Sequence, residues 1–184
     1  EQEAIYYMTG SSRDVLAGSP HLEAFADKGL EVLLFSDPVD EVWLEQMPPE
    51  YQGKKFQSVG RGEIDLASGD AKEGEDSDRE QEAEAYQDLI QCIRTAVQSD
   101  VKEVRLSNRL KQSPACLVVD EGDLSPQLEA MLRQAGQEVP ERKPILELNP
   151  DHPILKRLQS IFAEDGTDAR LSEYAQLLFG QAVL

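Results

Sequence analysis

The stretch Glu147-Leu148-Asn149-Pro150-Asp151-His152-Pro153 joins a short apolar run at residues 145–146 to an amphipathic run at residues 154–162. This order predicts the end of a strand, a rigid turn and the start of a helix. The two prolines suit the turn and the first helical turn, because proline fixes φ and has no backbone N–H to leave unpaired. Asn149 or Asp151 is expected to accept hydrogen bonds from the first free N–H groups of the helix.

His152 carries the unusual chemistry of this stretch, and two interpretations remain open. A ring N–H bonded to a nearby carbonyl would be structural, whereas proton transfer or metal binding would make the residue functional. Asp37 is the other residue on which a small α/β enzyme could be built, although carboxylates in a first helical turn are expected from the helix dipole alone. No Ser/His/Asp or Cys/His spacing places a nucleophile beside a base. The sequence therefore predicts no catalytic residue.

The charge of the chain restricts its partners. Its 184 residues include 36 acidic and 18 basic side chains, which give a formal net charge of -18. A field of this sign repels phosphate backbones and anionic lipid, so we expect binding neither to nucleic acid nor to a membrane. Two cysteines and two histidines, widely separated, predict no metal site. Cys92 and Cys116 are expected to be reduced thiols, with a disulfide as the alternative.

Residues 1–68 alternate short apolar runs with helical patterns. Residues 4–8, 30–35 and 56–59 are rich in strand formers, and helices are expected at 20–28 and 39–47. Short buried strands separated by helices favour parallel pairing. This part of the chain is therefore predicted to be a small three-layer α/β/α unit.

Residues 69–82 contain almost no apolar side chain and mark a change in composition. We interpret them as a solvated acidic linker or a helix start lying in water, with an acidic interaction segment as the alternative. Residues 83–184 then predict an α+β domain, with strands at 101–106, 115–119 and 143–148 among four helices. The fold class of the whole chain is accordingly mixed α/β.

The last helix, from residue 169 onward, has an unusually broad apolar band. Such a band exceeds what one-sided packing in a small domain requires, so part of it is expected to meet another helix or another chain. A purely structural oligomerisation module is therefore one candidate function. The side chains in the band are Leu171, Tyr174, Ala175, Leu177, Leu178, Phe179, Ala182 and Val183.

Several motifs together resemble one family, in order and over nearly the whole chain. Ile5-Tyr6-Tyr7-Met8-Thr9-Gly10 and Asp37-Pro38-Val39-Asp40-Glu41 look like the end of the middle domain of the ninety-kilodalton heat-shock chaperones. Val104-Arg105-Leu106-Ser107-Asn108-Arg109-Leu110 and the opening stretch look like the C-terminal domain of that family. The short segment between Gly136 and Lys143 resembles the bacterial HtpG type.

The resemblance implies a cytoplasmic, ATP-dependent, homodimeric chaperone that binds partly folded client proteins. In the family, the site for ATP and Mg lies in an N-terminal domain and the catalytic arginine lies earlier in the middle domain. This chain is thus expected to be a piece of a longer protein, without catalytic, cofactor-binding or metal residues of its own. The family's dimer interface uses two C-terminal helices per subunit, and the chain ends with the first, so dimerisation is expected to be weakened.

The resemblance also assigns candidate contact residues. Client contacts are expected on a helix of the C-terminal domain and after the Asp-Glu pair of the middle domain, where the tryptophan stands one position later than in the bacterial pattern. Core packing remains the alternative for Leu128 and Leu132. The client candidates are Leu124, Leu128, Met131, Leu132, Val42 and Trp43. The candidates for the dimer interface are Leu171, Tyr174, Leu178, Phe179 and Val183.

Overall fold

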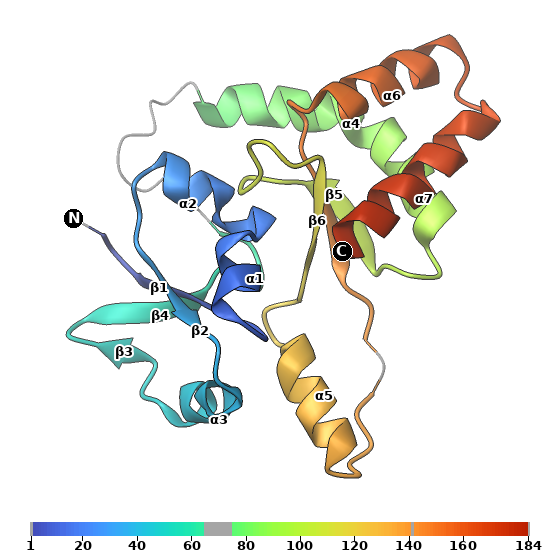
Figure 1. Cartoon of the computed structure of the whole chain (residues 1–184). Coiled ribbons are helices and arrows are strands. Elements are labelled where there is room, and N and C mark those ends of the chain that lie inside the picture. Colours follow the sequence, from blue (N-terminus) through green and yellow to red (C-terminus); the bar gives the residue numbers. More distant parts are fainter. Residues whose placement is uncertain (1, 65–74, 141, 184) are drawn as a thin grey trace. The chain divides into compact units, whose positions relative to one another are not determined.

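The computed structural model describes residues 2–64, 75–140 and 142–183, which belong to two compact units (Figure 1). Unit 1 comprises Glu1–Glu63 and Val119–Arg142, and unit 2 comprises Ile64–Val118 and Lys143–Leu184. The chain therefore passes from one unit to the other after Glu63, after Val118 and after Arg142. Of the expected linker, residues 69–74 lie outside the described residues, and residues from Glu75 onward belong to helix α4 (Glu75–Val97).

Unit 1 is built on a four-stranded sheet of order β2-β1-β4-β3. Strand β1 pairs in parallel with both β2 and β4, which confirms the predicted parallel arrangement. Strand β3, which the sequence did not predict, forms an antiparallel hairpin with β4. The strands are β1 (Ile5–Thr9), β2 (Val32–Phe35), β3 (Glu50–Tyr51) and β4 (Lys54–Ser58).

Helices complete unit 1 around a small apolar core. Phe25 is almost fully buried and packs edge-to-face on Tyr6, with ring centroids 4.8 Å apart. Leu16 is also buried, and its side chain lies so close to Gly10 that a Cβ there would meet Leu16 Cδ2 at 2.6 Å. Glycine at position 10 therefore lets the turn after β1 pack closely against the Leu16 side chain. The helices are α1 (Arg13–Ala17), the 3-10 turn η1 (Pro20–Leu22), α2 (Glu23–Asp27), α3 (Pro38–Gln46) and α5 (Pro126–Gln134).

Unit 2 combines a three-stranded mixed sheet with three helices, as an α+β fold predicts. Strand β7 lies in the middle, parallel to β5 and antiparallel to β6. The helices pack together beside the sheet (Figure 1), and the apolar core between them includes Leu146 and Leu148 of β7. The elements are α4 (Glu75–Val97), β5 (Glu103–Leu106), β6 (Ala115–Val118), β7 (Ile145–Leu148), α6 (Pro153–Glu164) and α7 (Ala169–Val183).

A buried polar network surrounds Glu147, whose side chain alternates along β7 with the core residues Leu146 and Leu148. Its carboxylate accepts hydrogen bonds from Arg105 at 2.8 Å, from Arg109 at 2.9 Å and from the Ser107 hydroxyl at 2.8 Å. A buried charge is tolerated when it is paired and hydrogen-bonded in this way. The network links β7 to β5 and to the segment after β5.

The turn after β7 is held by Asn149 and His152. The Asn149 amide donates to the Ser113 carbonyl at 3.0 Å, and its Oδ1 accepts from the backbone N–H of Asp151 at 3.0 Å. The N-cap of α6 is His152, whose Nδ1 accepts from the backbone N–H of Ile154 at 3.2 Å. The expectation that Asn149 or Asp151 caps the helix was therefore wrong. The structural interpretation of His152 is supported. Its ring was expected to donate a hydrogen bond to a carbonyl, however, and instead it accepts one from a backbone N–H.

Both cysteines are free thiols, as predicted. Among the helices that the structure describes, none is both long enough and apolar enough to cross a membrane. Within the same residues, no three side chains of His, Cys, Asp or Glu are grouped so that they could hold a metal ion.

Candidate functional site

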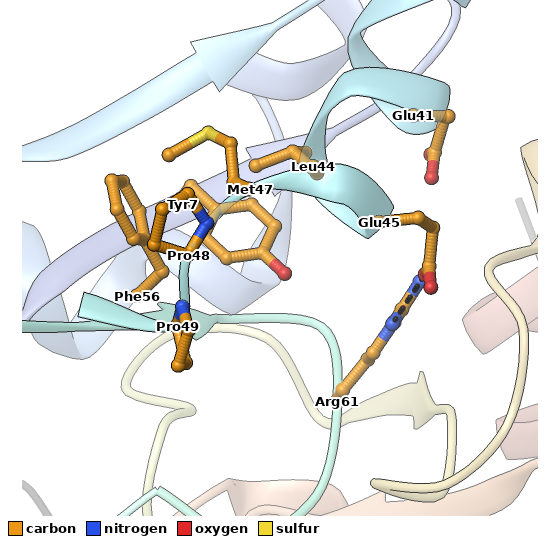
Figure 2. A pocket seen from close by; sticks show the side chains of 9 residues that line it. All are labelled: Tyr7, Glu41, Leu44, Glu45, Met47, Pro48, Pro49, Phe56 and Arg61. Atoms are coloured by element: carbon orange, nitrogen blue, oxygen red, sulfur yellow. Dashed lines mark ion pairs between the residues drawn. The ribbon is translucent and has the colours of Figure 1, made fainter. Parts of the chain in front are cut away.

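A pocket of about 230 Å³ opens in unit 1 beside β1, α3 and β4. Figure 2 shows that its lining separates into two ends. At one end Glu41, Glu45 and Arg61 lie together, and the Tyr7 hydroxyl points toward them. The other end, around the ring of Tyr7, is apolar and consists of Leu44, Met47, Pro48, Pro49 and Phe56.

The charged end contains one loose ion pair and one buried carboxylate oxygen without a partner. Arg61 Nη1 lies 3.7 Å from Glu45 Oε1, and the Glu45 side chain is half exposed. Glu41 is only 3% exposed, and its Oε1 has no hydrogen-bond partner. Burying a carboxylate oxygen without a donor is unfavourable, so such a group calls for an explanation.

The same surroundings shift the pKa of the Tyr7 phenol. Burial raises the pKa of the Tyr7 hydroxyl above its ordinary value of 10.0; the Arg61 guanidinium opposes this rise, and the carboxylates of Glu41 and Glu45 add to it. The hydroxyl is therefore protonated at neutral pH. In that state it can both donate and accept a hydrogen bond inside the pocket.

Sequence reasoning missed Glu41, which it treated as an ordinary carboxylate of a first helical turn. Glu41 does lie in the first turn of α3, together with Asp40. The two side chains point in different directions. Asp40 Oδ2 accepts a hydrogen bond from the Asp37 backbone N–H, whereas the Glu41 side chain points into the unit. Only the spacing of Glu41, Leu44 and Glu45, which places the three on one side of a helix, could have indicated a shared pocket.

The next two residues of α3, Val42 and Trp43, form an exposed apolar surface. Trp43 is 50% exposed, and its ring packs edge-to-face on Phe35 with centroids 5.9 Å apart. Phe35 in turn contacts Tyr7 at 6.1 Å. A continuous row of three aromatic rings thus runs from this exposed surface to the wall of the pocket.

The four candidates on and before α5 are all half-buried: Leu124, Leu128, Met131 and Leu132. Ser125 begins the helix, and its hydroxyl accepts from the backbone N–H of Leu128 at 3.1 Å. Helices α3 and α5 belong to the same unit and lie close to one another. The structure therefore brings both groups of predicted client-contact residues, which are far apart in the sequence, into unit 1.

The five candidates on α7 divide by burial. Leu171 and Leu178 are buried in the core of unit 2, and Phe179 packs against that core. Tyr174 and Val183 are exposed. Leu177, which lies in the apolar band of this helix, is 67% exposed and enlarges the uncovered surface.

Asp37 and His152, on which an enzyme could have been built, belong to different units. His152 is engaged as the cap of α6, and the Asp37 backbone is held by Asp40. Neither residue lines the pocket of unit 1.

Comparison with known proteins gives concordant matches over the full length of the chain. The sequence model of the family described as Hsp90 protein matches residues 1–184. Chaperone protein HtpG of Nocardia farcinica is 48% identical over 189 aligned residues, and the proteins of the same name from Geobacter sulfurreducens and Streptomyces coelicolor are 49% and 50% identical over 183. Each match covers all of this chain, which spans only 28–29% of the length of these relatives.

Proposed function

Because the chain belongs to the Hsp90 protein family, we propose that it supplies client binding and homodimerisation to a bacterial ATP-dependent chaperone of the cytoplasm. ATP and Mg would bind to a part of the longer protein that these 184 residues do not include. The chain itself would then have no ATPase activity. The observation that carries the proposal is the exposed apolar surface of Val42 and Trp43 in the same unit as the half-buried row on α5.

The chemistry of this surface suits partly folded proteins. Such clients expose apolar segments of varied shape, and an uncovered apolar patch rimmed by polar residues is typical of a protein interaction site. Trp43 offers a large aromatic face, and the flexible thioether of Met131 can adapt to different partners. The high negative charge keeps such a patch soluble and favours clients with basic segments.

Replacing Trp43 and Met131 tests client binding in the longer protein. Trp43→Ser and Met131→Ser should each reduce the suppression of client aggregation, while the melting temperature changes little because neither residue is fully buried. The control is Val15→Ser, since Val15 is also an exposed apolar residue of unit 1 but lies on α1. Unchanged suppression in the double variant Trp43→Ser/Met131→Ser would reject the proposed client surface.

Dimerisation through α7 is supported by its uncovered residues Tyr174, Leu177 and Val183. Leu177→Ser should raise the dimer dissociation constant, measured by analytical ultracentrifugation of the longer protein. Glu173→Ser is the polar control, because Glu173 is exposed on the same helix. Equal dissociation constants for Leu177→Ser and the unmodified protein would place the interface elsewhere.

A separate experiment tests the proposal that this chain does not hydrolyse ATP. The purified 184-residue chain should release no phosphate from ATP, whereas the longer protein should hydrolyse it. Hydrolysis by the isolated chain that co-purifies with its folded form would contradict the proposal.

A further inference from the structure

The pocket of unit 1 contains a group that the proposed function does not use. Glu41 is almost fully buried, lines the pocket, and has an Oε1 atom without a hydrogen-bond partner. Unpaired buried carboxylates are rare, because removing the charge from water is not offset by a donor. A ligand with a hydrogen-bond donor near Oε1 would provide the partner that this oxygen lacks.

The charge of the pocket indicates which kind of donor fits. Its charged lining residues are two carboxylates, Glu41 and Glu45, and one guanidinium, Arg61. Arg61 faces Glu45, so the unmatched charge of -1 falls on Glu41. A neutral donor would satisfy the oxygen but leave the charge, whereas a cationic donor satisfies both and forms the stronger bond.

The apolar end of the pocket adds a second requirement. Leu44, Met47 and Phe56 gather around the Tyr7 ring, next to the charged groups (Figure 2). This surface suits a few methylene groups, which gain free energy by leaving water. The Tyr7 hydroxyl, between the two ends, can accept one further N–H.

We propose that this pocket binds a guanidinium or ammonium group carried on a short apolar stem. The cation donates to Glu41 Oε1, and the stem lies on the apolar end. Metal binding does not fit, because no group of three or more potential ligands exists among the described residues. An anion does not fit either, because Glu41 would repel it. The proposal is independent of client binding and dimerisation.

The first experiment compares two probes that differ in charge but hardly in shape. N-acetyl-arginine amide and its neutral isostere, N-acetyl-citrulline amide, are titrated into the 184-residue chain, and binding is followed by NMR shifts of unit 1. The arginine derivative should bind at least tenfold more tightly. Equal affinities for the two probes, or binding of neither, would overturn the proposal.

Substitutions then assign the binding to Glu41. Glu41→Gln keeps the size and removes the charge, and it should weaken binding of the arginine derivative at least tenfold. Glu50→Gln is the matched control, because Glu50 is exposed in unit 1 and does not line the pocket. If Glu41→Gln binds like the unmodified chain, the cation site is refuted. Fluorescence of Trp43, the chain's single tryptophan, checks that unit 1 remains folded.

If Glu41→Gln fails to fold, Glu45→Gln serves instead. It also removes one negative charge from the pocket, and it should weaken binding several-fold, whereas unchanged binding would count against the proposal. The source of the cation is resolved by two further probes, agmatine and a glycine-flanked peptide with one arginine. Tighter binding of agmatine indicates a free organic cation, and tighter binding of the peptide indicates a polypeptide side chain; either supports the pocket.

Discussion

Arg109 donates a hydrogen bond from Nε to Glu147 Oε2 over 2.9 Å, with side chains only 2% and 4% exposed. Arg105 approaches the other carboxylate oxygen at 2.8 Å, so a single acid holds two guanidinium groups. A buried pair of this kind adds little free energy relative to an apolar core, but removing one partner leaves an uncompensated buried charge. Glu147 is the member whose loss would affect both arginines.

The variant Glu147→Gln should therefore lower the free energy of unfolding by about 3–5 kcal/mol. Urea denaturation followed by circular dichroism measures this loss. The control Glu173→Gln, at an exposed position on α7, should stay within about 0.5 kcal/mol of the unmodified chain. A loss below about 1 kcal/mol in Glu147→Gln would mean that the network relaxes without cost.

His152 should act through the helix cap and not through chemistry. His152→Ala removes the acceptor for the Ile154 N–H and should cost about 1 kcal/mol of stability. His152→Asn offers a side-chain oxygen at the same position and should recover most of that loss. Thermal unfolding of the two variants gives the comparison. Equal stability of His152→Ala and the unmodified chain would show that the ring does not support α6.

Asp168 gives the chain an acid-sensitive contact at the start of α7. Its carboxylate accepts hydrogen bonds from the Arg170 side chain and backbone N–H, which lower its pKa from 3.8 to about 2. Because the pKa is lower in the folded state, the contribution is complete above pH 3.8 and is lost as the pH falls toward 2. NMR titration of the carboxyl carbon should give a midpoint near 2, and Asp168→Asn should remove this part of the pH dependence. A midpoint at the ordinary value would contradict the contact.

The unpaired carboxylate oxygen of Glu41 should lower the stability of unit 1. Glu41→Leu removes a buried carboxylate with one unpaired oxygen and should raise the free energy of unfolding by about 1–3 kcal/mol. Unfolding followed by Trp43 fluorescence reports on this unit. Glu50→Leu, at an exposed site, is the control. A destabilised Glu41→Leu variant would indicate that the carboxylate supports the fold.

The sequence predicted most elements because their signals are local. Apolar runs marked β1, β2, β4, β6 and β7, and Pro126 after Ser125 marked the start of α5. The short hairpin β3–β4 escaped notice because Glu50–Tyr51 is too short to show alternation. Its signal lay in the turn, where Gln52 and Gly53 have φ values of 52° and 78°. Two-residue hairpin turns require such positive φ angles.

The candidate site was harder to predict, because it depends on contacts between distant residues. The burial of Glu41 depends on how α3 lies on β1 and on the chain after β4, and no residue pattern encodes that approach. The same holds for α5, whose amphipathic sequence predicts a helix but not the unit that it joins. The family resemblance drew attention to Val42 and Trp43, whose exposure is compatible with that role.

The interleaved course of the chain also affects the order in which it can fold during synthesis. Unit 1 needs residues on both sides of Ile64–Val118, so its last segment emerges about 80 residues after Glu63. At roughly 5–20 residues per second, this delay is roughly 4–16 s. During that interval the sheet β2-β1-β4-β3 is already available but lacks α5. During synthesis, unit 1 would therefore pass through an incompletely folded state whose apolar surface stays exposed until α5 is available.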